Sequence, residues 1–213
     1  MALILAVNPG STSTKIACFN DTEKFFEKNI PFPDEERKSF KNVTDQLERR
    51  VEMITQALTE EGIEPSSFDA SVGRGGLLAP IPSGTYIVGE EMKEYLKKAP
   101  RGEHASNLGA FIAEHFAKLS HCGAYIVDPV SVDEMSDEAR ISGAPEIERV
   151  SLVHALNHKA VARRAAAKLG KKYEECRLIV AHLGSGVTLA VHRFGKMTDV
   201  SGAKSDGPMS PER

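Results

Sequence analysis

No apolar run in this sequence approaches the roughly 18 residues that a membrane-spanning helix needs, and the apolar stretch 2–7 is too short for a signal peptide. Basic residues form no patch, because the 27 Lys and Arg are interspersed with 30 Asp and Glu and the net charge is -3. The three cysteines lack the spacing of metal ligands. These absences predict a cytoplasmic protein with reduced thiols that binds neither membranes nor nucleic acid.

The common nucleotide-binding signatures are missing as well. No GxxxxGK[ST] occurs and no GxGxxG follows an apolar run, so we expect neither a P-loop nor a Rossmann site. His154 and His158 lie four residues apart and would share a helix face, as in HExxH zinc sites. Ala155 stands where that motif has Glu, so we reject zinc. We expect one of these histidines at a site and the other in the packing.

What the sequence does contain is a pair of similar segments, LILAV-NPGSTST-KIACF from Leu3 and LIVAH-LGSGVT-LAVHR from Leu178. Each predicts a β-hairpin whose turn holds a Gly-Ser pair and hydroxyl groups. Glycine lets the backbone approach a ligand, while the hydroxyls and Lys15 can donate to phosphate oxygens. Two such hairpins suggest a duplicated domain with a nucleotide in the cleft between the halves. The alternative is that two ordinary polar turns resemble each other by chance.

Strand and helix patterns alternate along the rest of the chain, which favours an α/β architecture with a central sheet. We expect helices over 43–58, 92–98, 108–119 and 151–169, and a polar helical turn over 133–139. A soft boundary near 145–152 divides the chain into a first domain, 1–150, and a second, 151–213. A second domain that matched the first would need about a hundred further residues, so we expect it to be incomplete.

Three single residues stand where functional sites are often found. Arg74 ends a predicted strand among glycines, and His104 precedes the N-terminus of a predicted helix, where anions bind. Asp128 ends a buried-type strand, a common place for a metal ligand. Each has an ordinary alternative: a solvated arginine, a surface histidine, and the cap of a turn before Pro129.

Several longer segments resemble the acetate/butyrate kinase family of the actin, sugar-kinase and Hsp70 superfamily. They are, in the family's order, NPGSTSTKIA, VGRGGLLAPI, EHASNLGAFIA, DPVSVDEM, SLVHALNHKAVARRAA, HLGSGV and the terminal SPER. The resemblance covers 3–213 and implies an actin-like ATPase (ribonuclease H-like) fold, a mixed sheet flanked by helices. Members of the family are longer, so 1–150 would be the N-terminal acyl- and phosphate-binding domain. Residues 151–213 would be the truncated beginning of the second, nucleotide-binding domain.

The resemblance also implies a set of site residues. Substrate and phosphate would be bound by Asn8, Ser11, Ser13, Lys15, His104, Gly184, Ser185 and Gly186. Catalysis would rest on Arg74, His154, Arg213 and Asp128. Asn8 and Asp128 would also hold Mg²⁺. Ser185 departs from the acetate kinases, which carry Asn at the matching position.

The implied reaction is reversible transfer of the γ-phosphoryl group of ATP to butyrate or a related short-chain fatty acid, giving an acyl phosphate and ADP. A fatty acid has a pKa near that of Glu, about 4.3, so its carboxylate is already an ionised nucleophile. The remaining task is to bring anions together, and arginines, a histidine and Mg²⁺ perform it. We also expect a homodimer or larger assembly, and no turnover by these 213 residues alone.

The acyl chain length follows from a weaker pattern. Gly75, Gly76 and Val153 stand where the acetate kinases carry larger side chains, which favours a roomier acyl pocket and butyrate as substrate. The alternatives are an acetate or propionate kinase and, from another class, a non-catalytic nucleotide-binding domain.

Overall fold

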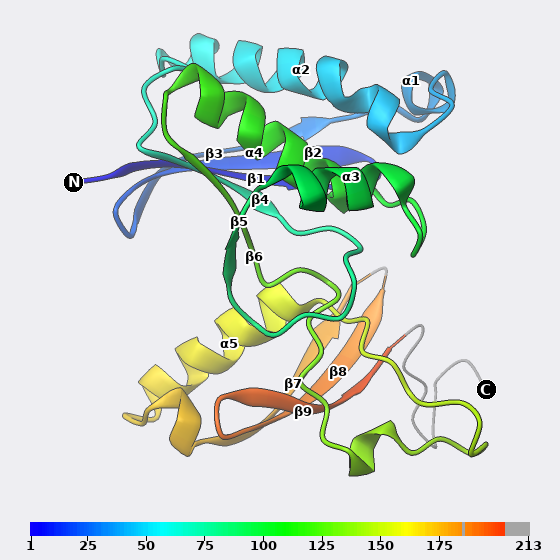
Figure 1. Cartoon of the computed structure of the whole chain (residues 1–213). Helices are drawn as coiled ribbons and strands as arrows, with labels where there is room; N and C mark the ends of the chain where they lie inside the picture. Colours follow the sequence, from blue (N-terminus) through cyan, green and yellow to red (C-terminus); the bar gives the residue numbers. More distant parts are fainter. Residues whose placement is uncertain (185, 203–213) are drawn as a thin grey trace. The chain divides into compact units, whose positions relative to one another are not determined.

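The structure is a computed structural model, and it describes residues 1–184 and 186–202. The chain forms two compact units (Figure 1). The first contains Met1–Leu78 and Thr85–Val127, and the second contains Ala79–Gly84 and the chain from Asp128 onward. The second unit therefore begins earlier in the chain than the domain boundary expected between 150 and 151, which stays a prediction.

The first unit is built on a six-stranded mixed sheet with the order β3-β2-β1-β4-β6-β5. The strands are β1 (Leu3–Pro9), β2 (Ser13–Asn20), β3 (Glu23–Pro31), β4 (Ala70–Arg74), β5 (Thr85–Ile87) and β6 (Gly123–Val127). The pairs β1–β2, β2–β3 and β5–β6 are antiparallel, and β4 runs parallel to both β1 and β6. The predicted first hairpin is β1–β2.

Helices cover one face of this sheet (Figure 1). They are α1 (Asp34–Lys38), α2 (Leu47–Glu60), α3 (Glu90–Lys98) and α4 (Leu108–Leu119), with short 3₁₀ helices η1 (Val43–Gln46) and η2 (Ala105–Asn107). Alternation along β1 turns Leu5 and Val7 toward the helices, where they pack with Ile54 of α2 and Ile112 of α4. The apolar residues at helical spacing thus form the core as the sequence predicts.

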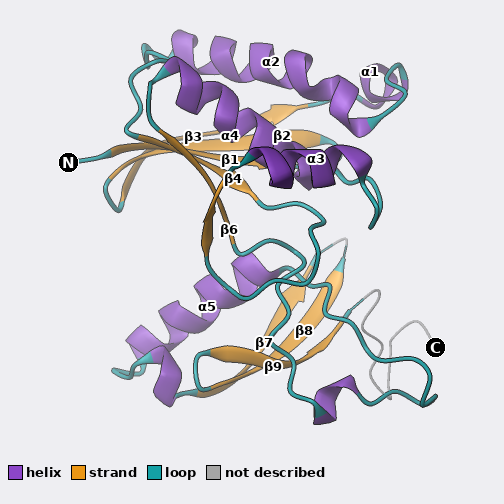
Figure 2. Ribbon diagram, viewed as in Figure 1, coloured by secondary structure: helices purple, strands orange, loops and turns teal. Residues whose placement is uncertain are grey.

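The second unit holds a three-stranded antiparallel sheet and one long helix (Figure 2). The strands are β7 (Arg177–Leu183), β8 (Val187–Arg193) and β9 (Lys196–Ser201), and the helices are α5 (Ala155–Lys168), η3 (Glu138–Arg140) and η4 (Tyr173–Glu175). Ala162 and Ala166 of α5 pack against Val180 of β7. The sheet's other face exposes Ile179 and Leu183. The predicted second hairpin is β7–β8.

Two sequence expectations are corrected in this unit. The helix expected over 151–169 begins only at Ala155, because Val153 donates its N–H to the carbonyl of Val130 and Ser151 donates its hydroxyl to that of Val132. The polar helical turn expected over 133–139 is confined to η3. Asp133 accepts two hydrogen bonds from Arg140 instead, at 3.0 and 2.9 Å.

Two short strands, β5 and β9, have no counterpart in the sequence expectations. Within the described residues, no helix combines the length and the hydrophobicity that crossing a membrane would require.

Candidate functional site

In the first unit, the candidate site lies where β1 and β4 end side by side. Their parallel register pairs Val7 with Gly73, so Asn8 and Arg74 follow on neighbouring strands. Arg74 Nη1 lies 3.5 Å from Asn8 Oδ1. Because Val7 is buried on the helix side of the sheet, alternation turns both polar residues to the opposite face. The structure therefore brings together an arginine and an amide that the sequence separates by 66 positions.

The β1–β2 hairpin adds a second cation to this edge. Lys15 stands directly opposite Asn8 in the antiparallel register and is exposed. Its ammonium lies 3.5 Å from Glu27 of β3. Ser13 precedes it by two residues, on the same face, and Ser11 is exposed in the turn. The predicted phosphate-binding groups of the first hairpin thus lie near the β1–β2 turn, and those within the strands share one face of the sheet.

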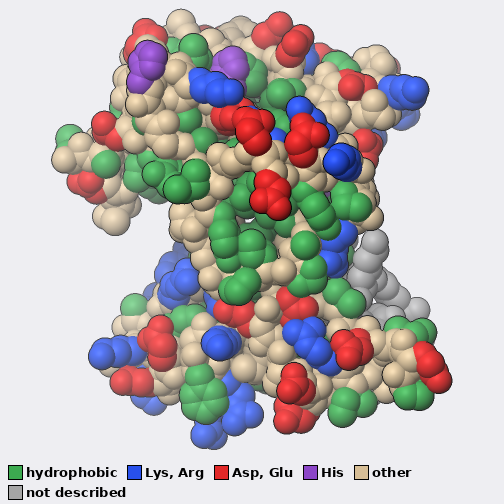
Figure 3. Space-filling model, in the orientation of Figure 1, with side chains coloured by type: hydrophobic (Ala, Val, Ile, Leu, Met, Phe, Trp, Pro, Cys, Tyr) green, Lys and Arg blue, Asp and Glu red, His purple; other side chains and the backbone are tan. Residues whose placement is uncertain are grey.

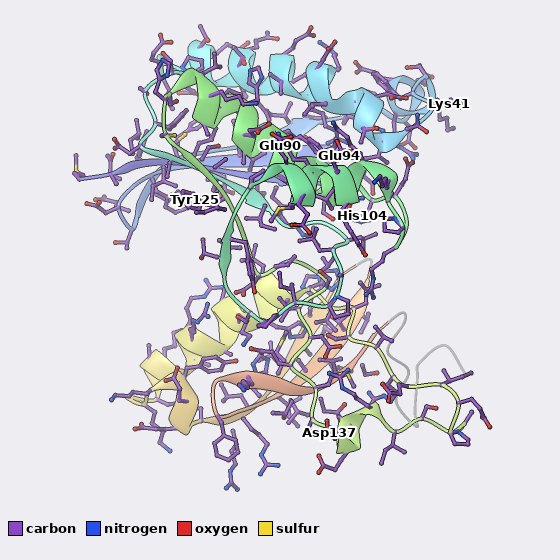
Figure 4. All side chains as sticks on the ribbon, in the orientation of Figure 1. Lys41, Glu90, Glu94, His104, Tyr125 and Asp137 are labelled. Carbon is purple, nitrogen blue, oxygen red and sulfur yellow. The ribbon has the colours of Figure 1, made fainter. Side chains whose placement is uncertain are left out.

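His104 comes from the loop between α3 and α4 (Figure 4). Its Nδ1 lies 2.8 Å from the hydroxyl of Ser106 and accepts the backbone N–H of the same residue at 3.1 Å. Burial, and then the charge of Arg74, lowers the pKa of His104, so the ring is neutral at pH 7. With Nδ1 accepting, the ring proton is on Nε2, which leaves His104 as a neutral donor.

Close packing against α4 fixes the backbone around Arg74. A Cβ added at Gly73 would lie 2.1 Å from the carbonyl oxygen of Gly109, and one added at Gly109 would lie 2.0 Å from that of Arg74. Only glycines permit so near an approach of strand and helix. Burial lowers the pKa of the Arg74 guanidinium, which remains a cation at neutral pH.

Two of the three small residues behind the expected roomier acyl pocket, Gly76 and Val153, are explained by packing instead. A Cβ at Gly76 would lie 2.6 Å from Oδ1 of Asn107, which also accepts the N–H of Leu77 at 2.9 Å. Val153 is buried in the core of the second unit beside Val132. Close packing accounts for both small residues without an acyl chain.

A buried arginine supports the first hairpin from the helix side of the sheet. Arg50 of α2 is 1% exposed. It donates to Thr14 Oγ1 at 2.7 Å, to the carbonyl of Gly10 at 3.0 Å and to Gln46 Oε1, and its guanidinium lies 4.2 Å from the centroid of the Phe32 ring. Burial lowers its pKa to about 10, so it stays charged at pH 7. All five of its hydrogen bonds go to uncharged oxygens, which places a cation under the turn that would meet phosphate.

We expect Arg50→Met to lower the free energy of unfolding of the chain by about 3 kcal/mol. The change leaves the oxygens of Gly10, Thr14 and Gln46 without the donors that satisfy them in the core. Urea unfolding measures the effect. Arg49→Met is the matched control, since the neighbouring Arg49 is exposed and pairs at the surface with Glu36; it should change stability little. Equal stability of the two variants would contradict the role given to Arg50.

In the second unit, four side chains gather beside the turn of the β7–β8 hairpin. His154 is the residue before α5, rather than on its face as expected, and its Nδ1 lies 2.9 Å from Thr188 Oγ1. His158, fully buried, places Nε2 at 2.9 Å from the same oxygen. The ring of His182 stacks on that of His154, with centroids 3.8 Å apart and planes at 10°. Thr188 thus bridges the two histidines of the α5 sequence.

The hairpin turn lies against these rings. A Cβ at Gly186 would stand 3.2 Å from Cε1 of His154, and one at Gly184 would stand 3.4 Å from Nε2 of His182. Two predicted site residues, Ser185 and Arg213, lie outside the described residues.

Asp128 has a defined partner set of its own. Its Oδ1 accepts the hydroxyl of Ser83 at 2.6 Å and the N–H of Gly84 at 2.9 Å, while Oδ2 lies 3.8 Å from Nη1 of Arg163. Its φ of 39° is a left-handed conformation, which Asp tolerates better than most residues. Mg²⁺ usually takes one or two protein carboxylates and completes its shell with phosphate oxygens and water. Of the two carboxylate oxygens only Oδ2 could take such a role, since Oδ1 is engaged twice, and Oδ2 would have to exchange its contact with Arg163 for the metal.

Sequence reasoning missed three residues of these clusters: Arg50, His182 and Thr188. His182 had a usable signal, being a lone histidine in an apolar strand directly before the Gly-containing turn. On the face that Figure 3 shows, Lys and Arg lie among Asp and Glu, in line with the interspersed charges of the sequence. Among the described residues, that face shows no broad surface of basic side chains alone.

Comparison with known proteins gives one consistent picture. The model of the Acetokinase family matches residues 147–204. Butyrate kinase 1 of Clostridium acetobutylicum is 50% identical over 214 aligned positions, which cover 100% of this chain and 60% of the relative. A probable butyrate kinase of Listeria monocytogenes is 46% identical over 99% of this chain and 59% of its own length. The chain thus spans about three fifths of the length of these curated relatives.

Solved structures support the same fold. Acetate kinase of Porphyromonas gingivalis matches 96% of this chain and 58% of its own with a TM-score of 0.66 at 18% identity. A propionate kinase of Francisella tularensis matches 95% and 58% with a TM-score of 0.64 at 19% identity. The expected α/β actin-like fold is thereby confirmed.

Proposed function

We propose that a full-length protein containing this chain has the activity of the butyrate kinases, to which this chain is similar over essentially its whole length. The protein that contains it transfers the γ-phosphoryl group of ATP reversibly to butyrate or a related short-chain fatty acid, giving acyl phosphate and ADP. The observation that carries this proposal is the 46–50% identity to butyrate kinases across essentially the entire chain.

The first unit would supply the groups that handle anions. Arg74 binds the substrate carboxylate or the phosphoryl group in flight, since a guanidinium forms paired hydrogen bonds to either. Asn8, Ser11, Ser13 and Lys15 donate to phosphate oxygens from the first hairpin. His104 donates through Nε2 without adding charge. The pairing of Asn8 with Arg74 at 3.5 Å supports a shared task for these two side chains.

The second unit would supply the groups beside the second hairpin. His154 stabilises the transferring phosphoryl group, and Gly184, Ser185 and Gly186 give phosphate access to the backbone. Arg213 is proposed as a second active-site arginine from the family motif alone. Asp128 and Asn8 are the proposed protein ligands of Mg²⁺, which when bound neutralises charge on the nucleotide phosphates.

A panel of acids tests the substrate. A full-length protein that contains this chain is incubated with ATP and hydroxylamine, which traps acyl phosphate as hydroxamate. We expect kcat/KM to rise from acetate through propionate to butyrate, by up to about fourfold per carbon because a buried methylene contributes about 0.8 kcal/mol. Isobutyrate shows whether branching is accepted.

The outcomes separate the alternatives. A preference for acetate would contradict the butyrate assignment and favour an acetate or propionate kinase. Nucleotide binding without hydroxamate from any acid would favour a non-catalytic nucleotide-binding domain. The cytoplasm and a homodimer or larger assembly are our proposals for compartment and oligomeric state; free cysteines at 18, 122 and 176 suit a reducing compartment.

A further inference from the structure

Thr188 of β8 occupies a position with strict hydrogen-bond requirements. Its Oγ1 lies 2.9 Å from Nδ1 of His154 and 2.9 Å from Nε2 of His158. Thr188 is 4% exposed and His158 is fully buried. The register of the β7–β8 hairpin places Thr188 opposite His182, whose ring stacks on His154. One hydroxyl therefore serves two imidazoles in a place with almost no solvent access.

Counting protons leaves two arrangements. A hydroxyl carries one hydrogen and can accept two hydrogen bonds. If both rings donated to Thr188, its own buried hydrogen would find no acceptor among the described residues, because Oγ1 bonds there only to the two rings. Thr188 therefore donates to one ring and accepts from the other. In the first arrangement, His158 donates from Nε2 to Thr188, and Thr188 donates to Nδ1 of His154. In the second, His154 donates from Nδ1 to Thr188, and Thr188 donates to Nε2 of His158.

The far nitrogen of His158 decides between them. Its Nδ1 is buried and finds no hydrogen-bond partner among residues 1–184 and 186–202. Burial lowers the pKa of His158 to about 4, so the ring is neutral at pH 7 and carries a single N–H. The second arrangement would put that N–H on the unpartnered Nδ1, where a buried donor goes unsatisfied. The first puts it on Nε2, where Thr188 accepts it.

We infer that Thr188, backed by His158, is a positioning residue that holds His154 in the tautomer with its proton on Nε2. The two hydrogen bonds run in one direction: His158 Nε2–H donates to Thr188 Oγ1, and the Thr188 hydroxyl donates to His154 Nδ1. The imidazole of His154 then presents an N–H donor at its other end.

That donor end lies beside the hairpin turn. A Cβ at Gly186 would stand 3.6 Å from Nε2 of His154, so this nitrogen is next to the glycines proposed to admit phosphate. The stacked ring of His182, whose Nδ1 lies 2.9 Å from Nδ2 of Asn157, limits rotation of the His154 ring. A fixed Nε2–H can stabilise charge on a phosphoryl oxygen without moving a proton. The mechanistic part of this inference rests on the proposed function, whereas the tautomer itself does not.

Nitrogen-15 NMR of histidine side chains in the chain itself tests the tautomer at pH 7, with His154→Gln assigning the signals. We expect His154 to carry its proton on Nε2, and its Nδ1 signal to show the displacement that an accepted hydrogen bond causes. Thr188→Val should remove that displacement, and Thr188→Ser should restore it. A wild-type His154 protonated on Nδ1, or an Nδ1 signal that Thr188→Val leaves in place, would overturn the inference.

Kinetics of a full-length protein supply the second measurement. Thr188→Val should lower kcat roughly tenfold with little change in the KM for the acid, and Thr188→Ser should recover most of the loss. If Thr188→Val does not fold, the inference is still tested by the NMR tautomer of His154 in the wild type and in Thr188→Ser. Failure of the proposed function would appear as absence of acyl phosphate from the wild type, whereas failure of this inference would appear in the NMR spectrum.

Discussion

Arg74→Ala is expected to lower kcat/KM for acyl phosphate formation by about a thousandfold or more in a full-length protein. Both reactants of the proposed reaction are anions, so its barrier would depend on cations placed where charge concentrates. Arg74 lies beside Asn8 at the end of β4, and its charge is felt by His104, whose pKa it helps to lower. Arg74→Lys should recover only part of the activity, because an ammonium cannot form the paired contacts of a guanidinium.

The control for Arg74 is Arg37→Ala, which removes a partly exposed arginine that pairs with Asp34 within α1. It should leave both kcat/KM and the melting temperature nearly unchanged. Hydroxamate formation gives the rates, and thermal unfolding verifies that Arg74→Ala folds. If the folded Arg74→Ala variant kept a kcat/KM within threefold of the wild-type value, the proposed role of Arg74 in the reaction would be wrong.

Gly109→Ala is expected to lower the free energy of unfolding by about 3 kcal/mol or more. The added methyl would stand 2.0 Å from the carbonyl oxygen of Arg74, so strand β4 and helix α4 must separate. The nearest atom belongs to the residue that carries the proposed anion contact. The variant should therefore lose activity even at temperatures where it remains folded.

Gly143→Ala is the matched control for Gly109, because a Cβ at Gly143 meets nothing within 4 Å and its backbone does not require glycine. Urea unfolding of the chain compares the two variants, and the hydroxamate assay of a full-length protein adds the activity. Equal stability of Gly109→Ala and Gly143→Ala would contradict the close approach of β4 and α4.

The parts of the fold that the sequence predicts are those with a local cause. The hairpins at Leu3 and Leu178 follow from apolar runs around a Gly-containing turn, and α4 follows from its apolar spacing. Helix α5 starts late because its first expected residues pair with the carbonyls of distant residues, Val130 and Val132. The hydrophobic pattern of one segment cannot show hydrogen bonds to residues that are distant in the sequence.

The same limit applies to the candidate site. Arg74 and His104 were singled out from strand-end and helix-start positions, and their roles stay predictions. The structure places Arg74 Nη1 3.5 Å from Asn8 Oδ1 and His104 Nδ1 2.8 Å from the hydroxyl of Ser106. Arg50 stands in a charged stretch of α2 and resembles a solvated residue, although its partners are Thr14 and Gly10. Tertiary packing alone identifies it, as it does the bridging hydroxyl of Thr188.

The most direct test of the central proposal follows the oxygen that attacks the γ-phosphorus. A full-length protein is given ATP and butyrate labelled with oxygen-18 in its carboxylate, and hydroxylamine then cleaves the acyl carbon–oxygen bond of the product. If the carboxylate is the nucleophile, the released phosphate carries one oxygen-18 atom from butyrate, as mass spectrometry would show. Phosphate without label, formed at the rate of ADP, would mean that water rather than the carboxylate accepts the phosphoryl group, and would contradict the assignment as a carboxylate kinase.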